Sequence, residues 1–407
     1  MFIPLWEYYY SIQYNNNRFQ KINKQVNFLL IMMDNIVGIS RITMVIVAII
    51  LIIVAGVAIY VTTSKSIHPV TSSSTAVTPF KIAIISAYPS DSYFAEYTLA
   101  GLEQAASALN TSQRPIIVTP LYNVPQSSII STTQTLAQQG YKFIILYIDY
   151  ISQYVEIAKA NPGVLFADEY AIPNGFNLST YNFRDPESNT YTYNASNMVG
   201  WIPDLNGAYY VAGVAAALIT HSGKIGFVAA FNIPVLATWY NNFANGVHSV
   251  NKSIQVYYAF SNDWSDPTKG AAAADSLISL GCDVIATAGD TQSIGAAEEA
   301  TRKGVFAIGY PFNVNNISAQ YMLGSVYFNA TALMYTMIQD ALNNNLEHHF
   351  YTLDMAHHGE AFLLNPYLVS NGIITQSMLN RIKEAEQLVI NYTYTPTFNG
   401  TFPPISS

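Results

Sequence analysis

The sequence predicts an α/β protein with two doubly wound lobes behind an N-terminal transmembrane helix. Short apolar runs alternate with amphipathic stretches from residue 80 to residue 308, which is typical of βα units and a parallel sheet. A segment rich in Asn, Ser, Thr and Tyr, residues 183–204, interrupts this alternation once, and we interpret it as an inserted loop between two lobes. One uncharged apolar run, residues 42–61, precedes the alternating region and predicts the transmembrane helix.

The apolar run has the length and the flanking charges of a membrane anchor. A helix of about 20 residues spans ~30 Å of hydrocarbon. Basic residues precede the run and only Lys65 closely follows it, so the positive-inside rule places the N-terminus in the cytoplasm and the globular part outside the cell membrane. A cleaved signal peptide is the alternative, but its apolar core has ~7–15 residues and is followed by a small-x-small cleavage site, which this sequence lacks. We therefore expect an uncleaved single-pass anchor over residues 42–62.

The segments on either side of the anchor are not expected to form a core. Residues 1–41 are polar and patternless, and we expect them to be cytoplasmic, or absent from the protein if translation starts at Met32 or Met33. Residues 63–79 are rich in Ser and Thr and contain two prolines, which is typical of an extended linker.

Strands and helices of the globular part follow from the period of the apolar residues. Short β-branched runs predict buried strands at residues 80–87, 115–119, 143–148, 164–167, 224–229, 254–260, 284–286 and 305–308. Apolar residues at helical spacing predict helices at residues 93–109, 128–139, 150–160, 207–220, 236–250, 269–280 and 296–303. Ligands of such folds lie beyond the carboxyl ends of the strands, so we expect a cleft between the lobes there.

Composition excludes several classes of function. The chain has 17 Lys and Arg against 25 Asp and Glu and no basic cluster, so we expect no nucleic-acid partner. Cys282 is the only cysteine, which excludes an internal disulfide and a thiolate metal cluster, and we interpret it as a buried inert thiol.

Charged residues make up only 10% of the chain, where soluble proteins usually carry roughly 25%. Eight N-x-Ser/Thr sequences beyond the anchor are candidate glycosylation sites, and glycans would supply solubility that charge does not. They are Asn110, Asn177, Asn194, Asn251, Asn316, Asn329, Asn391 and Asn399. Sparse carboxylates would also make folding less sensitive to acid, so we hypothesise that the outer domain faces an acidic medium.

Five blocks carry a resemblance to a known family: GKIGFVAAFNIPVL at residues 223–236, NGVHSVN at 245–251, WSDPTKGAAAADSLISLGCDVIATAGD at 264–290, AAEEATRKGVFAIGY at 296–310 and LGSVYFN at 323–329. In order and spacing the chain from residue 81 to about residue 396 resembles the BMP (basic membrane protein, or PnrA-like) family of ABC-transporter solute-binding proteins. The resemblance implies a type I periplasmic-binding fold, a purine or nucleoside as the small-molecule solute, and an ABC permease as partner. It also implies three hinge crossings, with lobe one at 80–205 and 311–347 and lobe two at 206–310 and 348–403.

The resemblance also points to ligand-binding residues. Phe94 and Trp264 match the two stacking aromatics of the family and are expected to sandwich the solute, because flat purine faces favour aromatic rings. The alternative is that each belongs to the core of its lobe. Asp91 and Ser92 lie in the first strand–helix loop, where the family places polar contacts, and their alternative is an ordinary turn.

Asp290 and Thr291 follow the strand at 284–286, and there an edge-binding role and a helix cap are equally supported. Asp266, by contrast, is expected to cap the helix that begins near residue 269.

Two positions depart from the family pattern. The family often has an Asp after AIG and a Lys after the Ser-Val pair, both contacting ribose, whereas Pro311 and Phe328 stand nearest to those places here. Tyr310 and Phe328 instead enlarge an aromatic wall, which favours a free base, or another flat solute with apolar faces, over a nucleoside.

No residue pattern predicts catalysis or a cofactor. Phosphate loops and Ser-His-Asp or Cys-His arrangements are not evident, so we expect no catalytic residues and no enzyme activity. The pairs at 348–349 and 357–358 are adjacent histidines, which point to opposite sides of a strand, so we expect no metal site. The predicted function is an extracellular, membrane-anchored solute-binding protein of an ABC transporter. The alternative is a surface receptor or structural cell-surface protein with the same fold and no transport role.

Overall fold

The computed structural model describes residues 77–404 apart from residues 88–89, 91, 148–149, 151–152, 170, 174–191, 194, 347–349 and 398. Residues 77–407 form one compact unit, separate from residues 1–76. The N-terminal segment, the anchor at 42–62 and nearly all of the linker at 63–79 therefore lie outside the described residues. Among the helices that are described, none combines the length and the apolar character needed to cross a membrane.

The first sheet has six strands that all pair in parallel, in the order β13-β7-β4-β3-β1-β2. Its strands are β1 (Phe80–Ile85), β2 (Ile116–Leu121), β3 (Tyr141–Leu146), β4 (Leu165–Glu169), β7 (Met198–Trp201) and β13 (Phe350–Tyr351). The helices packed with it are α3 (Tyr93–Leu109), α4 (Ile129–Gln138), α5 (Tyr154–Ala160) and α10 (Ala330–Leu342), and η1 (Gln126–Ser128) is a short 3₁₀ turn. A separate parallel pair joins β5 (Ile172–Pro173) to β6 (Thr192–Tyr193).

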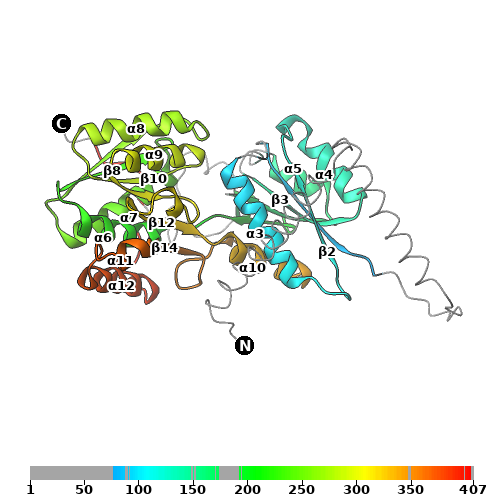
Figure 1. The fold of residues 1–407 in the computed structure, drawn as a ribbon. Helices are drawn as coiled ribbons and strands as arrows, with labels where there is room; N and C mark the ends of the chain where they lie inside the picture. The colour runs from blue at the N-terminus through cyan, green and yellow to red at the C-terminus, as the bar shows by residue number, and fades with distance from the viewer. Residues whose placement is uncertain are drawn as a thin grey trace, which may run out of the picture. The chain divides into compact units, whose positions relative to one another are not determined.

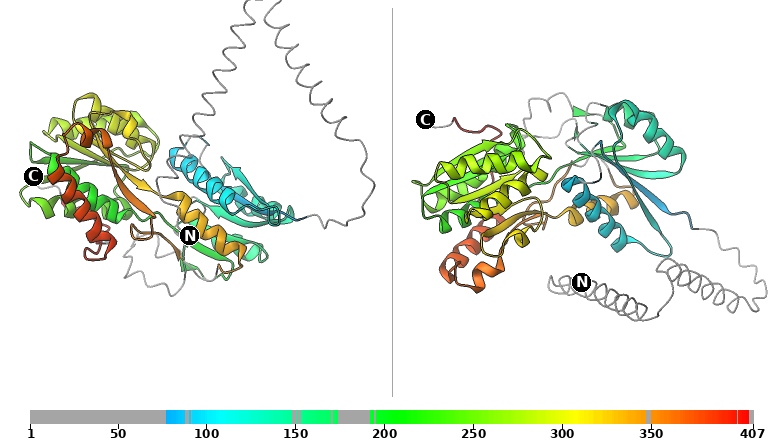
Figure 2. Two further views of the ribbon diagram at one scale, coloured as in Figure 1. Left: turned by 60° about the horizontal axis from the view of Figure 1, so that its bottom comes forward. Right: turned by 45° about the horizontal axis from the view of Figure 1, so that its top comes forward.

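The central strands of this sheet are buried on both faces, as their uninterrupted apolar sequences require. Side chains of α4 and α5 form the core on one face, and those of α3 and α10 belong to the core on the other. Figures 1 and 2 show α10 lying beside α3 although the two helices are far apart in the sequence. Their backbones approach closely, because a methyl group at Gly101 would come within 2.6 Å of the Ala330 side chain.

The second sheet also has six strands, in the order β14-β12-β11-β10-β8-β9, and only β14 runs antiparallel to its neighbour. Its strands are β8 (Lys224–Ala229), β9 (Gln255–Phe260), β10 (Val284–Ala288), β11 (Phe306–Gly309), β12 (Met322–Phe328) and β14 (Glu360–Leu364). Its helices are α6 (Asn206–Ile219), α7 (Pro234–Val250), α8 (Pro267–Ser279), α9 (Thr291–Arg302), α11 (Pro366–Ser370), α12 (Gln376–Ile390) and the 3₁₀ turn η4 (Asn315–Ile317). Helices α8 and α9 cover one face, and α6 and α7 cover the other (Figure 1).

The predicted fold class is confirmed in its two α/β lobes with parallel-sheet cores. Every strand and helix expected between residues 80 and 308 is present within a few residues of its predicted bounds, the helix at 296–303 beginning earlier, at Thr291. The interpretation of residues 183–204 as a loop was wrong for two parts, because β6 (Thr192–Tyr193) pairs with β5, and β7 (Met198–Trp201) pairs with β4 and β13. Strand β7 is only four residues long and follows a polar stretch, so it gave no periodic signal.

Two of the expected lobe boundaries also need correction. We expected residues 311–347 in lobe one, but β12 hydrogen-bonds to β11 and belongs to the second sheet, so the chain crosses near Asn329 instead. We expected lobe two to resume at residue 348, but β13 pairs with β7 in the first sheet, so the last crossing follows Tyr351. We use lobe one for the first sheet with its helices and lobe two for the second.

The three crossings are joined to one another by backbone hydrogen bonds. The Ile202 N–H, in the first crossing, donates to the Tyr351 carbonyl at 3.0 Å. The Asn329 N–H, in the second, donates to the Gly359 carbonyl in the third at 2.8 Å. The strands that leave one lobe are thus held side by side where they enter the other.

Two glycines let α6 and α7 pack backbone against backbone. A methyl group on Gly213 in α6 would overlap the Phe243 carbonyl oxygen, and one on Gly246 in α7 would overlap the Tyr210 carbonyl oxygen. Neither backbone oxygen is free to move without disturbing its helix, so both positions require glycine.

We predict that Gly213→Ala destabilises the protein by about 1–3 kcal/mol, because the added methyl group overpacks this contact. Thermal unfolding of the full chain in detergent, followed by circular dichroism, measures the loss. Gly163→Ala is the matched control, since a methyl group at Gly163 meets nothing within 4 Å. An equal effect of the two substitutions would show that the helix contact is not tight.

Candidate functional site

Asp290 lies in the turn between β10 and α9, beyond the carboxyl end of its strand. Gly289 precedes it with φ +152°, and a side chain there would overlap Gln292, so the turn depends on this glycine. The side chain of Asp290 makes no capping hydrogen bond to α9, whereas Asp266 caps α8 by accepting from the Thr268 N–H at 2.9 Å. Asp290 thus stands at the N-cap position of α9 without the usual capping hydrogen bond, and its edge-binding role stays a prediction.

The Asp290 carboxylate instead reaches lobe one. Its Oδ2 accepts a hydrogen bond from the Ser92 hydroxyl at 2.9 Å, and its Oδ1 accepts one from the Phe94 N–H at 3.1 Å. Burial raises the pKa of Asp290, although these two donors, together with the N–H and the hydroxyl of Thr291, favour the charged form and act in the opposite direction. One carboxylate from lobe two thus joins the first turn of α3 in lobe one.

The side chain of Phe94 in turn packs against a phenylalanine of lobe two. The Phe94 ring lies nearly parallel to the Phe328 ring, with an interplanar angle of 17° and 6.4 Å between centroids. Phe328 ends β12 and is buried, and its carbonyl accepts from the Tyr97 hydroxyl at 2.7 Å. The edge of Phe94 also meets Tyr147, just past β3, at 6.1 Å and 71°.

Trp264 and Tyr310 lie on the lobe-two side of the same region. The half-buried Trp264 ring packs on Phe231 at 5.2 Å, and the Trp264 carbonyl accepts from the Gln292 N–H, two residues beyond Asp290. Tyr310 is buried against Trp239 at 5.4 Å. Burial raises the pKa of Tyr310, and the negative charge of Asp290 adds to the effect.

The structure brings together four of the eight predicted binding residues by direct contact, namely Ser92, Phe94, Asp290 and Phe328. Thr291 follows Asp290 in the chain. The charge of Asp290 acts on the Tyr310 hydroxyl, and the Trp264 carbonyl contacts the first turn of α9, which begins just after Asp290. Within the described residues, Phe94 pairs with Phe328 and makes no ring contact with Trp264. Asp91 lies outside the described residues.

Sequence reasoning missed two residues of this region, Tyr147 and Glu169. Glu169 is the buried last residue of β4, and its charge raises the pKa of both Tyr147 and Tyr310 after the larger effect of burial. Both residues stand at or just past a strand's carboxyl end, which was the available signal. The strand that we predicted at 164–167 stopped two residues too early to include Glu169.

The described part of the chain holds no cluster of three or more His, Cys, Asp or Glu side chains suited to a metal ion. His357 pairs with Asp354 at 2.7 Å, and residues 348–349 lie outside the described residues. Cys282 is buried, and burial raises its pKa to about 12, which favours the unreactive thiol.

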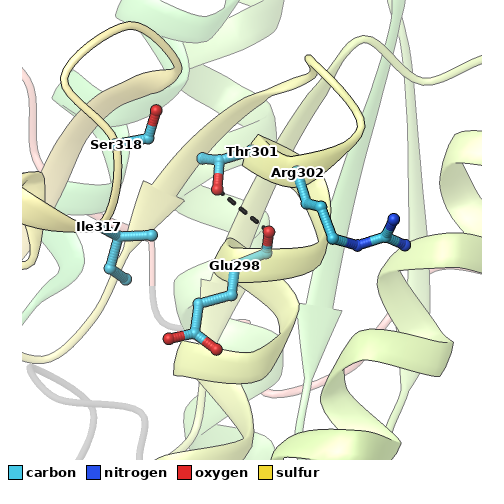
Figure 3. A pocket seen from close by; sticks show the side chains of 5 residues that line it. All are labelled: Glu298, Thr301, Arg302, Ile317 and Ser318. Atoms are coloured by element: carbon cyan, nitrogen blue, oxygen red, sulfur yellow. Dashed lines mark hydrogen bonds between the residues drawn. The ribbon is translucent and has the colours of Figure 1, made fainter.

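A hollow of about 360 Å³ lies elsewhere on lobe two (Figure 3). It is lined by Glu298, Thr301, Arg302, Ile317 and Ser318, where the Thr301 hydroxyl donates to the Glu298 carbonyl at 3.1 Å. These residues belong to the C-terminal half of α9, to η4 and to the residue that follows η4, whereas Asp290 precedes the other end of α9. At 1.5 Å per residue the two ends of this helix are roughly 16 Å apart, so the hollow is separate from the Asp290 region.

Residues 83–359 match the family of PnrA-like ABC transporter substrate-binding proteins, named Bmp. The chain belongs to this family. It is 30% identical over 175 residues to the purine-binding protein BAB2_0673 of Brucella abortus, covering 43% of this chain and 44% of that protein. It is 40% identical over 101 residues to the putative ABC transporter glucose-binding protein TsgA13 of Haloferax volcanii, covering 25% of each. These matches span less than half the length of either relative.

Solved structures support the fold. An ABC transporter solute-binding protein from Aeropyrum pernix K1 superposes with a TM-score of 0.62 at 17% identity, covering 78% of this chain and 94% of that one. The family resemblance and the two-lobed fold expected from the sequence are therefore confirmed.

We predict that Ser92→Ala raises the pKa of Asp290, because the hydroxyl donates to the charged carboxylate and lowers that pKa. A pH titration of ¹³C-labelled aspartate side chains, with the Asp290 signal assigned from Asp290→Asn, measures the change. Ser131→Ala is the control, since the Ser131 hydroxyl donates only to a carbonyl of its own helix and should leave the titration unchanged. A lower or unaltered pKa in Ser92→Ala would contradict the contact.

Proposed function

We propose that this protein is the membrane-anchored, extracellular solute-binding component of an ABC transporter and that it captures a purine base between its lobes. It carries out no covalent chemistry and passes the solute to an ABC permease. The observation that carries this proposal is the Asp290 carboxylate, which crosses to Ser92 and Phe94 beside two facing aromatic rings.

The facing rings suit a planar guest. A ring between two others needs two van der Waals contacts of about 3.5 Å each, or about 7 Å in all. The centroids of Phe94 and Phe328 are 6.4 Å apart and the ring planes are 17° from parallel, which is within the range of an offset-stacked pair in direct contact. A flat solute would therefore enter only after the lobes separate and part this pair, and closure would then stack it on both faces. Trp264, the partner expected from the family pattern, would cover an edge of the same site.

The carboxylate suits the edge of a purine. Ring and exocyclic N–H groups of a base are donors, and Asp290 offers two acceptor oxygens at the lobe boundary. In the described structure the Ser92 hydroxyl and the Phe94 N–H occupy these oxygens, so a solute would replace or share their hydrogen bonds. Pro311 and Phe328 stand where relatives carry polar ribose contacts, which favours the free base over the nucleoside.

The names of the two relatives support a small-molecule solute, and they also suggest glucose as the alternative to a purine. One is called a purine-binding protein and the other a putative glucose-binding protein, and each match covers less than half of the relative. Stacking between phenylalanine rings favours the purine, because sugars lack a flat aromatic face.

We predict that the full chain in detergent binds adenine in a calorimeter, binds adenosine more weakly and gives no heat with glucose. Phe94→Leu and Phe328→Leu should each weaken adenine binding about 10-fold, because one stacked face is worth about 1–3 kcal/mol. Phe306→Leu is the matched control, since Phe306 begins β11 at the end of the sheet far from Asp290.

Each outcome of this experiment decides between named functions. If the protein binds glucose and not adenine, its solute is a sugar and not a purine. The absence of binding heat with all three solutes would favour the alternative, a surface receptor or structural protein with the same fold. If Trp264→Ala weakens binding and Phe328→Leu does not, the stacking partner of Phe94 is Trp264.

The proposed location rests on the apolar run at residues 42–62, which would anchor the chain, and on the side of the membrane at which this family captures solutes. Five sequon asparagines are exposed in the structure, namely Asn110, Asn251, Asn316, Asn391 and Asn399. Asn329 differs: it caps α10, and its Nδ2 donates to the His358 carbonyl at 2.9 Å. Asn177 and Asn194 lie outside the described residues.

We predict glycans on exposed sequons and none on Asn329, because transfer requires a free side-chain nitrogen and Asn329 already uses its own. Peptide mass spectrometry of the protein purified from its native membrane measures occupancy at each site. Modification of the exposed sites would also place the globular domain outside the cytoplasm. Glycan on Asn329, or on none of the five, would contradict the prediction.

A further inference from the structure

Two buried carboxylates share the start of α6, directly after the first crossing between the lobes. Asp204 lies in that crossing and is 8% exposed, and Glu360 begins β14 directly after the third crossing and is 4% exposed. Three successive N–H groups at this helix start donate to them. Asn206 donates to Asp204 at 3.1 Å, and Gly207 and Ala208 donate to the two oxygens of Glu360 at 3.1 and 2.8 Å.

The two carboxylates are not equally satisfied. Both oxygens of Glu360 accept a backbone N–H, which suits a charged group at a helix start. Both donors to Asp204, the N–H and the Nδ2 of Asn206, go to Oδ1. Its Oδ2 accepts no hydrogen bond from the described residues, so Oδ2 is the atom at which a proton can sit.

No cationic side chain of the described residues forms an ion pair with either carboxylate. The third charge nearby is Asp354, in the third crossing, whose own partners are His357 and the Tyr392 hydroxyl. Burial is the largest cause that raises the pKa of Glu360, and repulsion from Asp204 and Asp354 adds to it. Burial, with repulsion from Asp354, likewise raises the pKa of Asp204 from 3.8 to about 6.

The charge of the Asp204–Glu360 pair can affect movement between the lobes, because the pair lies at the crossings. Rotation of one lobe against the other has to be taken up in the crossings, residues 202–205, Asn329 and 352–359. Asp204 lies within the first of these and Glu360 at the end of the third, and backbone bonds hold the crossings together at Ile202 and Asn329. Two charges buried side by side here would repel, and moving residues 202–205 away from β14 would relieve the repulsion.

We propose that the Asp204–Glu360 pair is a proton-binding switch in the hinge, and that proton uptake holds the crossings in the arrangement described here while proton loss loosens them. This goes beyond solute capture, because it makes lobe movement depend on the acidity of the medium.

The direction of the effect on stability follows from the folded and unfolded states. An unfolded chain releases the Asp204 proton near its ordinary pKa of 3.8, whereas the folded protein keeps it to about 6. The stabilisation is therefore fully present below pH of about 4 and is lost as the pH rises through about 6. This is the reverse of ordinary acid denaturation.

The test measures lobe movement without needing the solute. Nitroxide labels on Lys142→Cys in lobe one and Lys252→Cys in lobe two report the distance between the lobes in the full chain, since both positions are exposed and Cys282 is buried. From pH 4.5 to pH 7.5 we expect the distance distribution to broaden or shift. Asp204→Asn should remove the change, because its amide keeps the Oδ1 acceptor and carries no charge.

Thermal unfolding over the same pH range provides the second measurement. The melting temperature of the wild-type chain should fall by about 5 °C more than that of Asp204→Asn. Glu103→Gln, which removes an exposed carboxylate from α3, should behave as the wild type. If Asp204→Asn fails to fold, Glu360→Gln replaces it. A wild-type chain without pH-dependent distances, or a variant that retains them, overturns the proposal.

Discussion

Two buried carboxylates of the described residues, Asp290 and Glu360, are held by N–H and O–H donors, with no ion pair to lysine or arginine. Asp290 takes the Ser92 hydroxyl and the Phe94 N–H, and Glu360 takes two N–H groups at the start of α6. A chain with only 17 basic residues in 407 has few cations to place in its interior. Neutral donors satisfy the oxygens but compensate burial less completely than a cation does, so these acids hold their protons more firmly than usual. Both the region between the lobes and the hinge depend on this arrangement.

Most of the fold could be predicted because each lobe is built from local signals. Runs such as FKIAII and KIGFVA are too short and too apolar for anything but buried parallel strands. Three of the elements that were not predicted, β7, β12 and β13, owe their place to pairing with distant strands. β13 is two residues long, and hydrogen bonds to β7, far away in the sequence, decide which lobe it joins.

The candidate site, like the fold, could be predicted only where local sequence decides the structure. Residues just past strand ends could be identified from the sequence, and Ser92, Phe94 and Asp290 do meet. Which aromatic side chain faces Phe94 depends on where β12 lies, and the sequence did not reveal that β12 belongs to lobe two. Phe328 therefore entered the prediction as part of an aromatic wall, and only the strand pairing shows that it is the ring opposite Phe94.

The backbone contact between α6 and α7 has a consequence for how the lobes can move. At each glycine a backbone carbonyl oxygen of the other helix lies where a side chain would be. Neither helix can therefore bend or slide without a steric clash with its neighbour. The two helices consequently turn as one rigid block with the second sheet, and α6 cannot absorb any twist along its own length. Rotation between the lobes therefore has to be taken up at the crossings, and in the first of them only the four residues between Trp201 and Asn206 are left to change conformation.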